Sequence, residues 1–137
     1  MPVTPNSIIT PQTPKQAANI NTTAETSYTT PVNTALLFVA GVNGSRVTKL
    51  TSIPRVTVTA TNILLFTNAA PSNTTLVLID SVLMAANTLA TTTATPKTDW
   101  GVSDNTALYI AANSSVYVAT QVAFANGIVT KVEYADY

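Results

Sequence analysis

Hydrophobic and polar positions alternate through much of the chain after about residue 20. Residues 56–61 alternate valine or alanine with threonine, which is the period-two signature of a strand with one buried face. The same alternation occurs in residues 116–124 and 128–134. β-branched residues are frequent, and they lose side-chain freedom in helices, so helical segments are hard to find. The pattern predicts an all-β domain.

Two segments depart from simple alternation because they are hydrophobic on both faces. Residues 63–66 read Ile-Leu-Leu-Phe directly after the alternating run, and a bulge or bend near Asn62 would explain the change. Residues 76–84 form a second, mostly apolar strand that Asp80 and Ser81 interrupt.

Three turn signals predict hairpins between neighbouring strands. Asn126-Gly127 is the strongest, because Asn-Gly favours the tight turns that join paired strands. Asn43-Gly44 has the same role after residues 36–42, and Asn113 is expected to turn residues 108–110 into 116–123. About seven to nine short strands separated by turns predict an antiparallel β-sandwich or jelly roll.

The N-terminal segment has a different composition from the rest. Four of the eight prolines lie within its first fourteen residues, and proline favours extended backbone. We expect residues 1–19 to form an extended Pro/Thr-rich arm and residues 20–137 to form a single β-sandwich domain. Ile8 and Ile9 are the expected apolar anchor of an arm that docks on a neighbouring subunit. The alternative is a frayed tail without a docking role.

The chain is poorly equipped for catalysis. It contains no histidine and no cysteine, and only six acidic and six basic residues among 137. General acid–base catalysis needs a group that titrates near neutral pH, and a Ser–His–Asp triad is excluded outright. Four glycines form no phosphate-binding loop. We therefore expect a protein that is not an enzyme and holds no cofactor or metal.

Charge and hydropathy limit the partners in the same way. The net charge is zero and the basic residues are dispersed, which argues against nucleic acid and against an anionic membrane surface. No apolar run approaches the ~20 residues of a membrane helix. The first fourteen residues lack the features of a signal peptide, so synthesis in a cytoplasm is expected.

Three acidic residues are candidates for a functional site. Asp80 lies inside an apolar strand, either as a buried functional acid or, with more weight, facing solvent or an interface, or pairing with Arg46 or Arg55. Asp99 and Asp104 lie within the long polar segment 91–106, but two carboxylates without a third make a weak calcium site.

Trp100, the only tryptophan, is either a contact residue or a side chain folded back over the sandwich edge. Tyr137 belongs to a group of tyrosines in the last third of the chain whose spacing favours core or interface packing.

Three stretches carry a resemblance: residues 5–15 (PNSIITPQTPK), 76–86 (LVLIDSVLMAA) and 93–101 (TATPKTDWG). They resemble small proteins encoded in the virion modules of tailed phages and prophages, most of all capsid decoration (cement) proteins. The likeness spans most of the chain but involves no catalytic signature. Such proteins are β-rich domains on the outer capsid surface that clamp neighbouring capsomers, often as trimers with extended terminal arms.

The resemblance implies two partners, the major capsid protein and further copies of the chain itself. We expect Ile8, Ile9, Trp100 and Tyr137 to be the contact residues. Two other functions stay open. One is a phage tail component such as a tube or terminator subunit. The other is a carbohydrate-binding module that uses Trp100 and the loop from Asp99 to Asp104.

Overall fold

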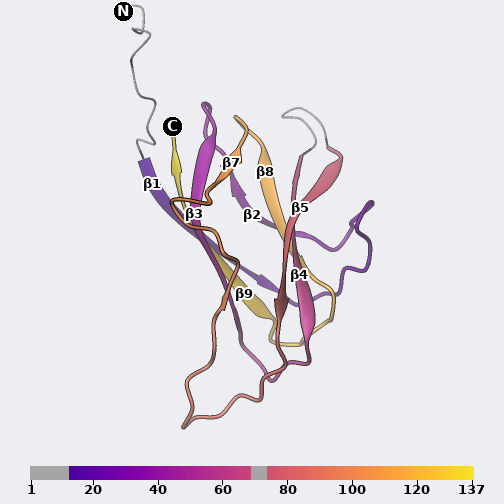
Figure 1. Ribbon diagram of the computed structural model, residues 1–137. Coiled ribbons are helices and arrows are strands. Elements are labelled where there is room, and N and C mark those ends of the chain that lie inside the picture. The colour runs from indigo at the N-terminus through magenta and orange to yellow at the C-terminus, as the bar shows by residue number, and fades with distance from the viewer. Residues whose placement is uncertain (1–12, 69–73) are drawn as a thin grey trace, which may run out of the picture.

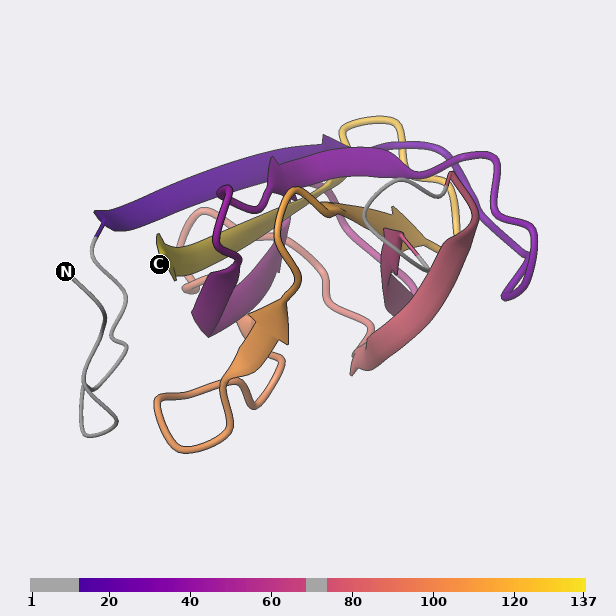
Figure 2. The ribbon, with the colours of Figure 1, turned by 90° about the horizontal axis from the view of Figure 1, so that it is seen from above.

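The computed structural model describes residues 13–68 and 74–137 (Figure 1). Nine strands and no helix are present in these residues, and they form two antiparallel sheets packed face to face. Seen from above, the sheets separate into two layers (Figure 2). The predicted antiparallel β-sandwich is therefore confirmed.

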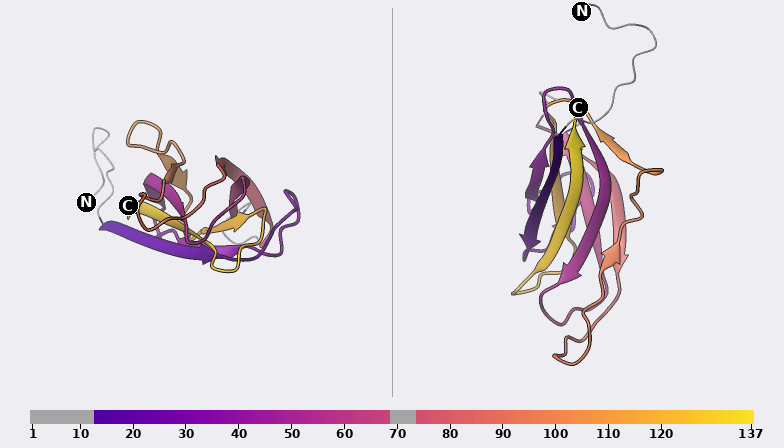
Figure 3. Two further views of the ribbon diagram at one scale, coloured as in Figure 1. Left: turned by 90° about the horizontal axis from the view of Figure 1, so that it is seen from below. Right: turned by 90° about the vertical axis from the view of Figure 1, so that its left-hand side faces the viewer.

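The strands divide unevenly between the sheets. Sheet A comprises β1 (Thr13–Asn21), β9 (Ile128–Asp136), β3 (Ser45–Pro54) and β6 (Thr98–Asp99) in spatial order, with β7 (Leu108–Ile110) also paired to β3. Sheet B comprises β2 (Ala35–Val39), β8 (Ser115–Thr120), β4 (Thr61–Asn68) and β5 (Leu76–Met84) in spatial order. In the right-hand view of Figure 3, β1, β9 and β3 run side by side.

Residues 13–19 of the arm expected over residues 1–19 belong to a strand, and residues 1–12 lie outside the described residues. β1 pairs with β9 along its whole length, from Thr13 opposite Asp136 to Asn21 opposite Ile128. Residues 13–19 are therefore part of the sandwich, and the expected domain boundary after residue 19 is wrong. Proline tolerates this position because β1 is the edge strand of sheet A, where a missing backbone donor costs little.

The three turns predicted to close hairpins connect the two sheets instead. β2 and β3 flank Asn43-Gly44 but lie in different sheets, and so do β8 and β9, which flank Asn126-Gly127. β7 and β8, on either side of Asn113, are also separated in this way. The turns form where expected, but the strands they join face each other across the core. The direct antiparallel pair of consecutive strands is β4 with β5.

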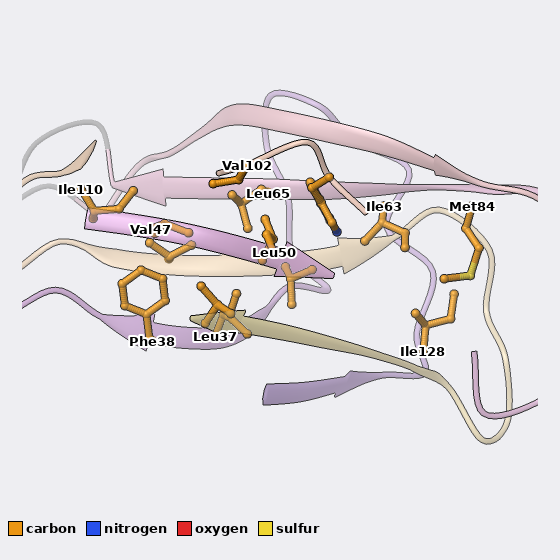
Figure 4. Packing of buried hydrophobic residues seen from close by; sticks show 14 of the residues in the cluster. Leu37, Phe38, Val47, Leu50, Ile63, Leu65, Met84, Val102, Ile110 and Ile128 are labelled. Carbon is orange, nitrogen blue, oxygen red and sulfur yellow. The ribbon is translucent and has the colours of Figure 1, made fainter. Parts of the chain in front are cut away.

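Hydrophobic side chains from both sheets fill the space between them (Figure 4). Leu50 and Ile128 from sheet A and Ile63 and Val118 from sheet B are completely buried. Burial on this scale supplies the main stabilising free energy, at roughly 25 cal/mol per Å² of apolar surface. The core needs no disulfide, and the chain has no cysteine to form one.

The run that is apolar on both faces has a structural explanation in β4. Ile63 and Leu65 point into the core, whereas Leu64 and Phe66 belong to a second apolar cluster on the opposite face of sheet B. The irregularity expected near Asn62 lies instead opposite β5, between Leu65 and Phe66. Strands that are apolar on both faces are typical of sheets covered on both sides.

A substitution at Gly127 would test how closely the turn between β8 and β9 approaches the end of β1. Gly127 has a φ of 73°, and a Cβ there would lie 2.5 Å from the Asn21 carbonyl oxygen. Gly127→Ala should lower the free energy of unfolding by about 3 kcal/mol, because backbone strain and a clash with backbone add together. Urea unfolding would measure it.

Gly101→Ala is the matched control, because Gly101 has a φ of 81° but no atom lies within 4 Å of the place that a Cβ would take. It should cost only the strain, about 1–2 kcal/mol. Equal losses in the two variants would contradict the close approach of the turn to β1.

Candidate functional site

The four expected contact residues differ in whether the structure describes them and in how far they are exposed. Ile8 and Ile9 lie outside the described residues. Trp100 is buried, with 8% of its surface exposed, and Tyr137 is half-buried at one end of the sandwich. Of Trp100 and Tyr137, only Tyr137 can therefore contribute to a contact surface.

Trp100 is part of the core. It follows β6, and its backbone N–H donates to the Leu50 carbonyl. Its indole Nε1 donates to Ser52 Oγ at 2.9 Å, and Ser52 in turn shares a hydrogen bond with Thr130 Oγ1 on the neighbouring strand. A buried indole N–H needs such a partner, and these hydroxyls provide it. The ring is packed over the sandwich interior and does not present the exposed face that a contact or a sugar platform requires.

Tyr137 shares one end of the sandwich with two exposed side chains, those of Tyr109 and Val42. Its ring is 5.9 Å from that of Tyr109, which is 63% exposed, and its backbone N–H donates to the Gly44 carbonyl. Val42, in the turn that contains Gly44, is 75% exposed. We call Val42, Tyr109 and Tyr137 the arm-end patch, because β1 begins at the same end, with Thr13 opposite Asp136. The C-terminus lies beside the start of β1 in Figure 1.

A buried carboxylate ties the elements under the patch together. Lys15 Nζ lies 2.7 Å from Asp136 Oδ2, while Ser45 Oγ and the Gly41 N–H donate to Asp136 Oδ1. Burial raises the pKa of the Asp136 carboxyl, but these donors and the Lys15 charge lower it by more, so its pKa lies below the usual range. The same contact raises the pKa of Lys15. The cluster joins the start of β1 to β9, β3 and the loop after β2.

A second buried carboxylate organises the loop at the opposite end. Glu25 is 2% exposed and accepts hydrogen bonds from the backbone N–H groups of Ser27, Val32 and Asn33, at 2.6–2.9 Å. Burial raises the pKa of Glu25, but the backbone donors lower it by more. The ordered loop presents Val32, which is 81% exposed. The sequence provides no signal for this role, because Glu25 lies among threonines without a motif.

The other acidic residues do not assemble into a catalytic or metal site. Asp80 accepts a hydrogen bond from the N–H of Ser81, and the ion pairs of the described chain join it to neither Arg46 nor Arg55. Asp99 accepts from the Gly101 N–H and lies 3.7 Å from Lys49 Nζ. Among residues 13–68 and 74–137, no group of three or more acidic side chains could hold a metal ion.

A shallow hollow of about 460 Å³ lies on the outer face of sheet A. Lys49, Lys97 and Lys131 surround it together with Asp99 and Glu133, above an apolar floor. Half of the basic residues of the chain are therefore gathered on this face. These ammonium and carboxylate groups make a charged surface on this side of the sandwich.

A scan against protein-family models, a search of curated proteins and a search of solved structures found no match for this chain. The part of the chain that the structure describes contains no helix with the length and hydropathy needed to cross a bilayer.

The two buried carboxylates predict a loss of stability in acid. Because folding lowers the pKa of Asp136 and Glu25, their contribution is complete above the unfolded pKa of about 4 and is lost as the pH falls through the folded pKa. Lys15 has the opposite sign: its contribution is complete below its ordinary pKa and is lost only at alkaline pH. Urea unfolding between about pH 7 and pH 2 should show the decline. Asp136→Asn should be less stable at neutral pH and should lose less on acidification; parallel profiles would contradict the role of Asp136.

Removing Glu25 should loosen its loop. Glu25→Ala leaves three backbone donors without an acceptor and should lower the free energy of unfolding by about 2–3 kcal/mol. Glu25→Gln keeps one oxygen and should cost less. Hydrogen exchange at the Val32 and Asn33 amides would report the loop directly. Glu133→Gln, at an exposed position, should change stability by less than about 0.5 kcal/mol, and an equal effect there would argue against this account.

Proposed function

We propose that this chain is a structural protein of a phage virion, a decoration (cement) protein that binds the outer capsid surface and clamps neighbouring shell subunits. The proposal rests on the resemblance of residues 5–15, 76–86 and 93–101 to virion proteins. It assigns the chain a mechanical role, with the major capsid protein and further copies of itself as partners.

The observation that carries the proposal is the arrangement of the arm end. The first residue of β1 and the arm-end patch lie at the same end of the sandwich, joined through Asp136. The exposed Val42 and Tyr109 therefore lie at the end of the sandwich where β1 begins, which is the end at which the proposed arm joins the domain. Aromatic side chains with one apolar face and one polar tip are enriched at such contacts.

The chemistry of the described charges supports binding rather than turnover. Glu25 and Asp136 are engaged in structural hydrogen bonds and an ion pair, and their pKa values are moved away from neutrality. An enzyme needs the opposite shift in a general base, toward the working pH. A protein of zero net charge also assembles with copies of itself without long-range repulsion.

Attachment to capsids tests the proposal. Deleting residues 2–12 leaves β1 and the Lys15–Asp136 pair in place, so the domain should keep its stability while its affinity for undecorated capsids falls at least about tenfold. Val42→Lys should weaken attachment as well, because it places a charge in the arm-end patch. Cosedimentation of the variants with capsids of the phage that encodes the chain would measure occupancy.

Val32→Lys is the control, because Val32 is 81% exposed, against 75% for Val42, and lies at the opposite end of the sandwich. This substitution should leave attachment unchanged. Full occupancy by the truncated protein would contradict the arm. Absence of capsid binding by the unaltered protein, with assembly into tubes or rings on its own, would replace the proposal with a tail subunit.

A further inference from the structure

The outer face of sheet B carries no charged side chain. Strand register and side-chain alternation assign to this face the positions not turned toward sheet A. Most are apolar and the remainder are neutral polar residues: Leu36, Val39, Ser115, Tyr117, Ala119, Asn62, Leu64, Phe66, Asn68, Leu76, Leu78, Ser81 and Leu83. The four strands contain a single charged residue, Asp80, and it pairs with Leu65 on the face turned to the core.

The outer face of sheet A has the opposite character. Lys49, Asp99, Lys131 and Glu133 all line the hollow on it. In an antiparallel sandwich, each outer face is normally solvated and polar, as the face of sheet A is. The two outer faces of the sandwich therefore differ in charge and polarity.

Apolar side chains remain open to solvent at both edges of the face. Leu64, Phe66 and Ala119 in the middle are buried by their neighbours. Leu36 on β2 is 47% exposed and Leu83 on β5 is 62% exposed. Leu36 and Leu83 therefore lie on either side of a buried apolar centre, and a partner covering the face would bury both.

Neutral hydrogen-bonded groups border the face at both ends. At one end, the Tyr28 hydroxyl and Asn62 Nδ2 both donate to Gln121 Oε1, at 3.1 and 3.0 Å. At the other end, the Ser115 N–H donates to Asn68 Oδ1 at 2.7 Å. An apolar centre with a satisfied polar rim and few charges is the anatomy of a protein–protein interface.

The free edge of β5 is unsuited to strand addition, which leaves packing through the face. Asp80 turns inward in the middle of the strand. The register shifts beside it, because Leu78 and Asp80 pair with the consecutive residues Phe66 and Leu65. Inward charges and bulges are the devices that block edge-to-edge pairing.

We propose that the outer face of sheet B packs against the same face of a second copy of this chain about a two-fold axis. A face without charge needs a partner face without charge, and an isologous pair provides it. Four strands spaced ~4.8 Å apart and roughly seven residues long make a face of about 19 Å by 23 Å, a flat area near half of the ~800 Å² that each partner buries in a stable interface. Side-chain relief adds to that area, so the dimer must use the whole face, from Leu36 to Leu83.

The proposal deepens the partner assignment made above but is tested without capsids. Light scattering and sedimentation equilibrium of the purified full chain should show a dimer at micromolar concentration. Leu36→Lys and Leu83→Lys, each at an exposed position, should raise the dissociation constant at least about tenfold and keep the far-ultraviolet circular dichroism and melting cooperativity of the unaltered protein. Val42→Lys, a matched change in the arm-end patch, should remain dimeric.

Each other outcome overturns the proposal. A monomer at about 100 μM overturns it without any variant, because the proposed dimer forms at micromolar concentration. So does a dimer that both lysine variants leave intact, a dimer that Val42→Lys dissociates, or a trimer in place of the dimer. Loss of capsid attachment with an intact dimer would instead count against the decoration role alone.

Discussion

The structure depends on hydrophobic contact between two sheets that the chain enters and leaves repeatedly. Consecutive strands such as β2 and β3, or β8 and β9, lie in opposite sheets, so most connections between strands lead from one sheet to the other. Each connection between the sheets places residues from different strands in the same core. Leu50 of sheet A and Ile63 of sheet B, for example, belong to one cluster. The core also admits polar atoms where they have partners: Trp100, Ser52 and Thr130 form a hydrogen-bonded chain inside it. Without the second sheet, none of these groups would be shielded from water.

The few charges of the chain are used for structure. Asp136 holds the start of β1 against β9 and the loop after β2, and Glu25 holds the loop at the other end. Both carboxylates are buried, and each is compensated by several donors, which is the condition under which a buried charge is tolerated. The sandwich therefore has two stiff ends. A stiff end loses little conformational entropy on binding, which favours the arm-end patch as a contact surface.

The two outer faces divide the remaining surface between water and protein partners. Lysines and carboxylates on sheet A keep that side solvated, whereas the outer face of sheet B lacks charge altogether. In the proposed assembly, copies pair through sheet B and attach through the arm end, which lies at one end of the strands. The two contacts use different surfaces, so both can be made by one copy at the same time.

The sequence by itself determined the class of fold and the positions of several strands and of the three turns, because alternation and Asn-Gly turns depend only on neighbouring residues. The alternating run at residues 56–60, expected to be a strand, lies instead between β3 and β4 and forms only an isolated bridge from Val58 to Asn87. It also predicted that residues 63–66 are apolar on both faces. Tertiary structure decided which strands pair: a turn has the same local geometry whether it closes a hairpin or crosses to the other sheet, and only burial against distant residues selects between them. The same dependence explains the candidate sites. Trp100 is buried because Ser52, 48 positions earlier in the chain, provides its hydrogen-bond acceptor. Tyr109 and Asp136 acquire their roles only when β7, β9 and the start of β1 meet at one end.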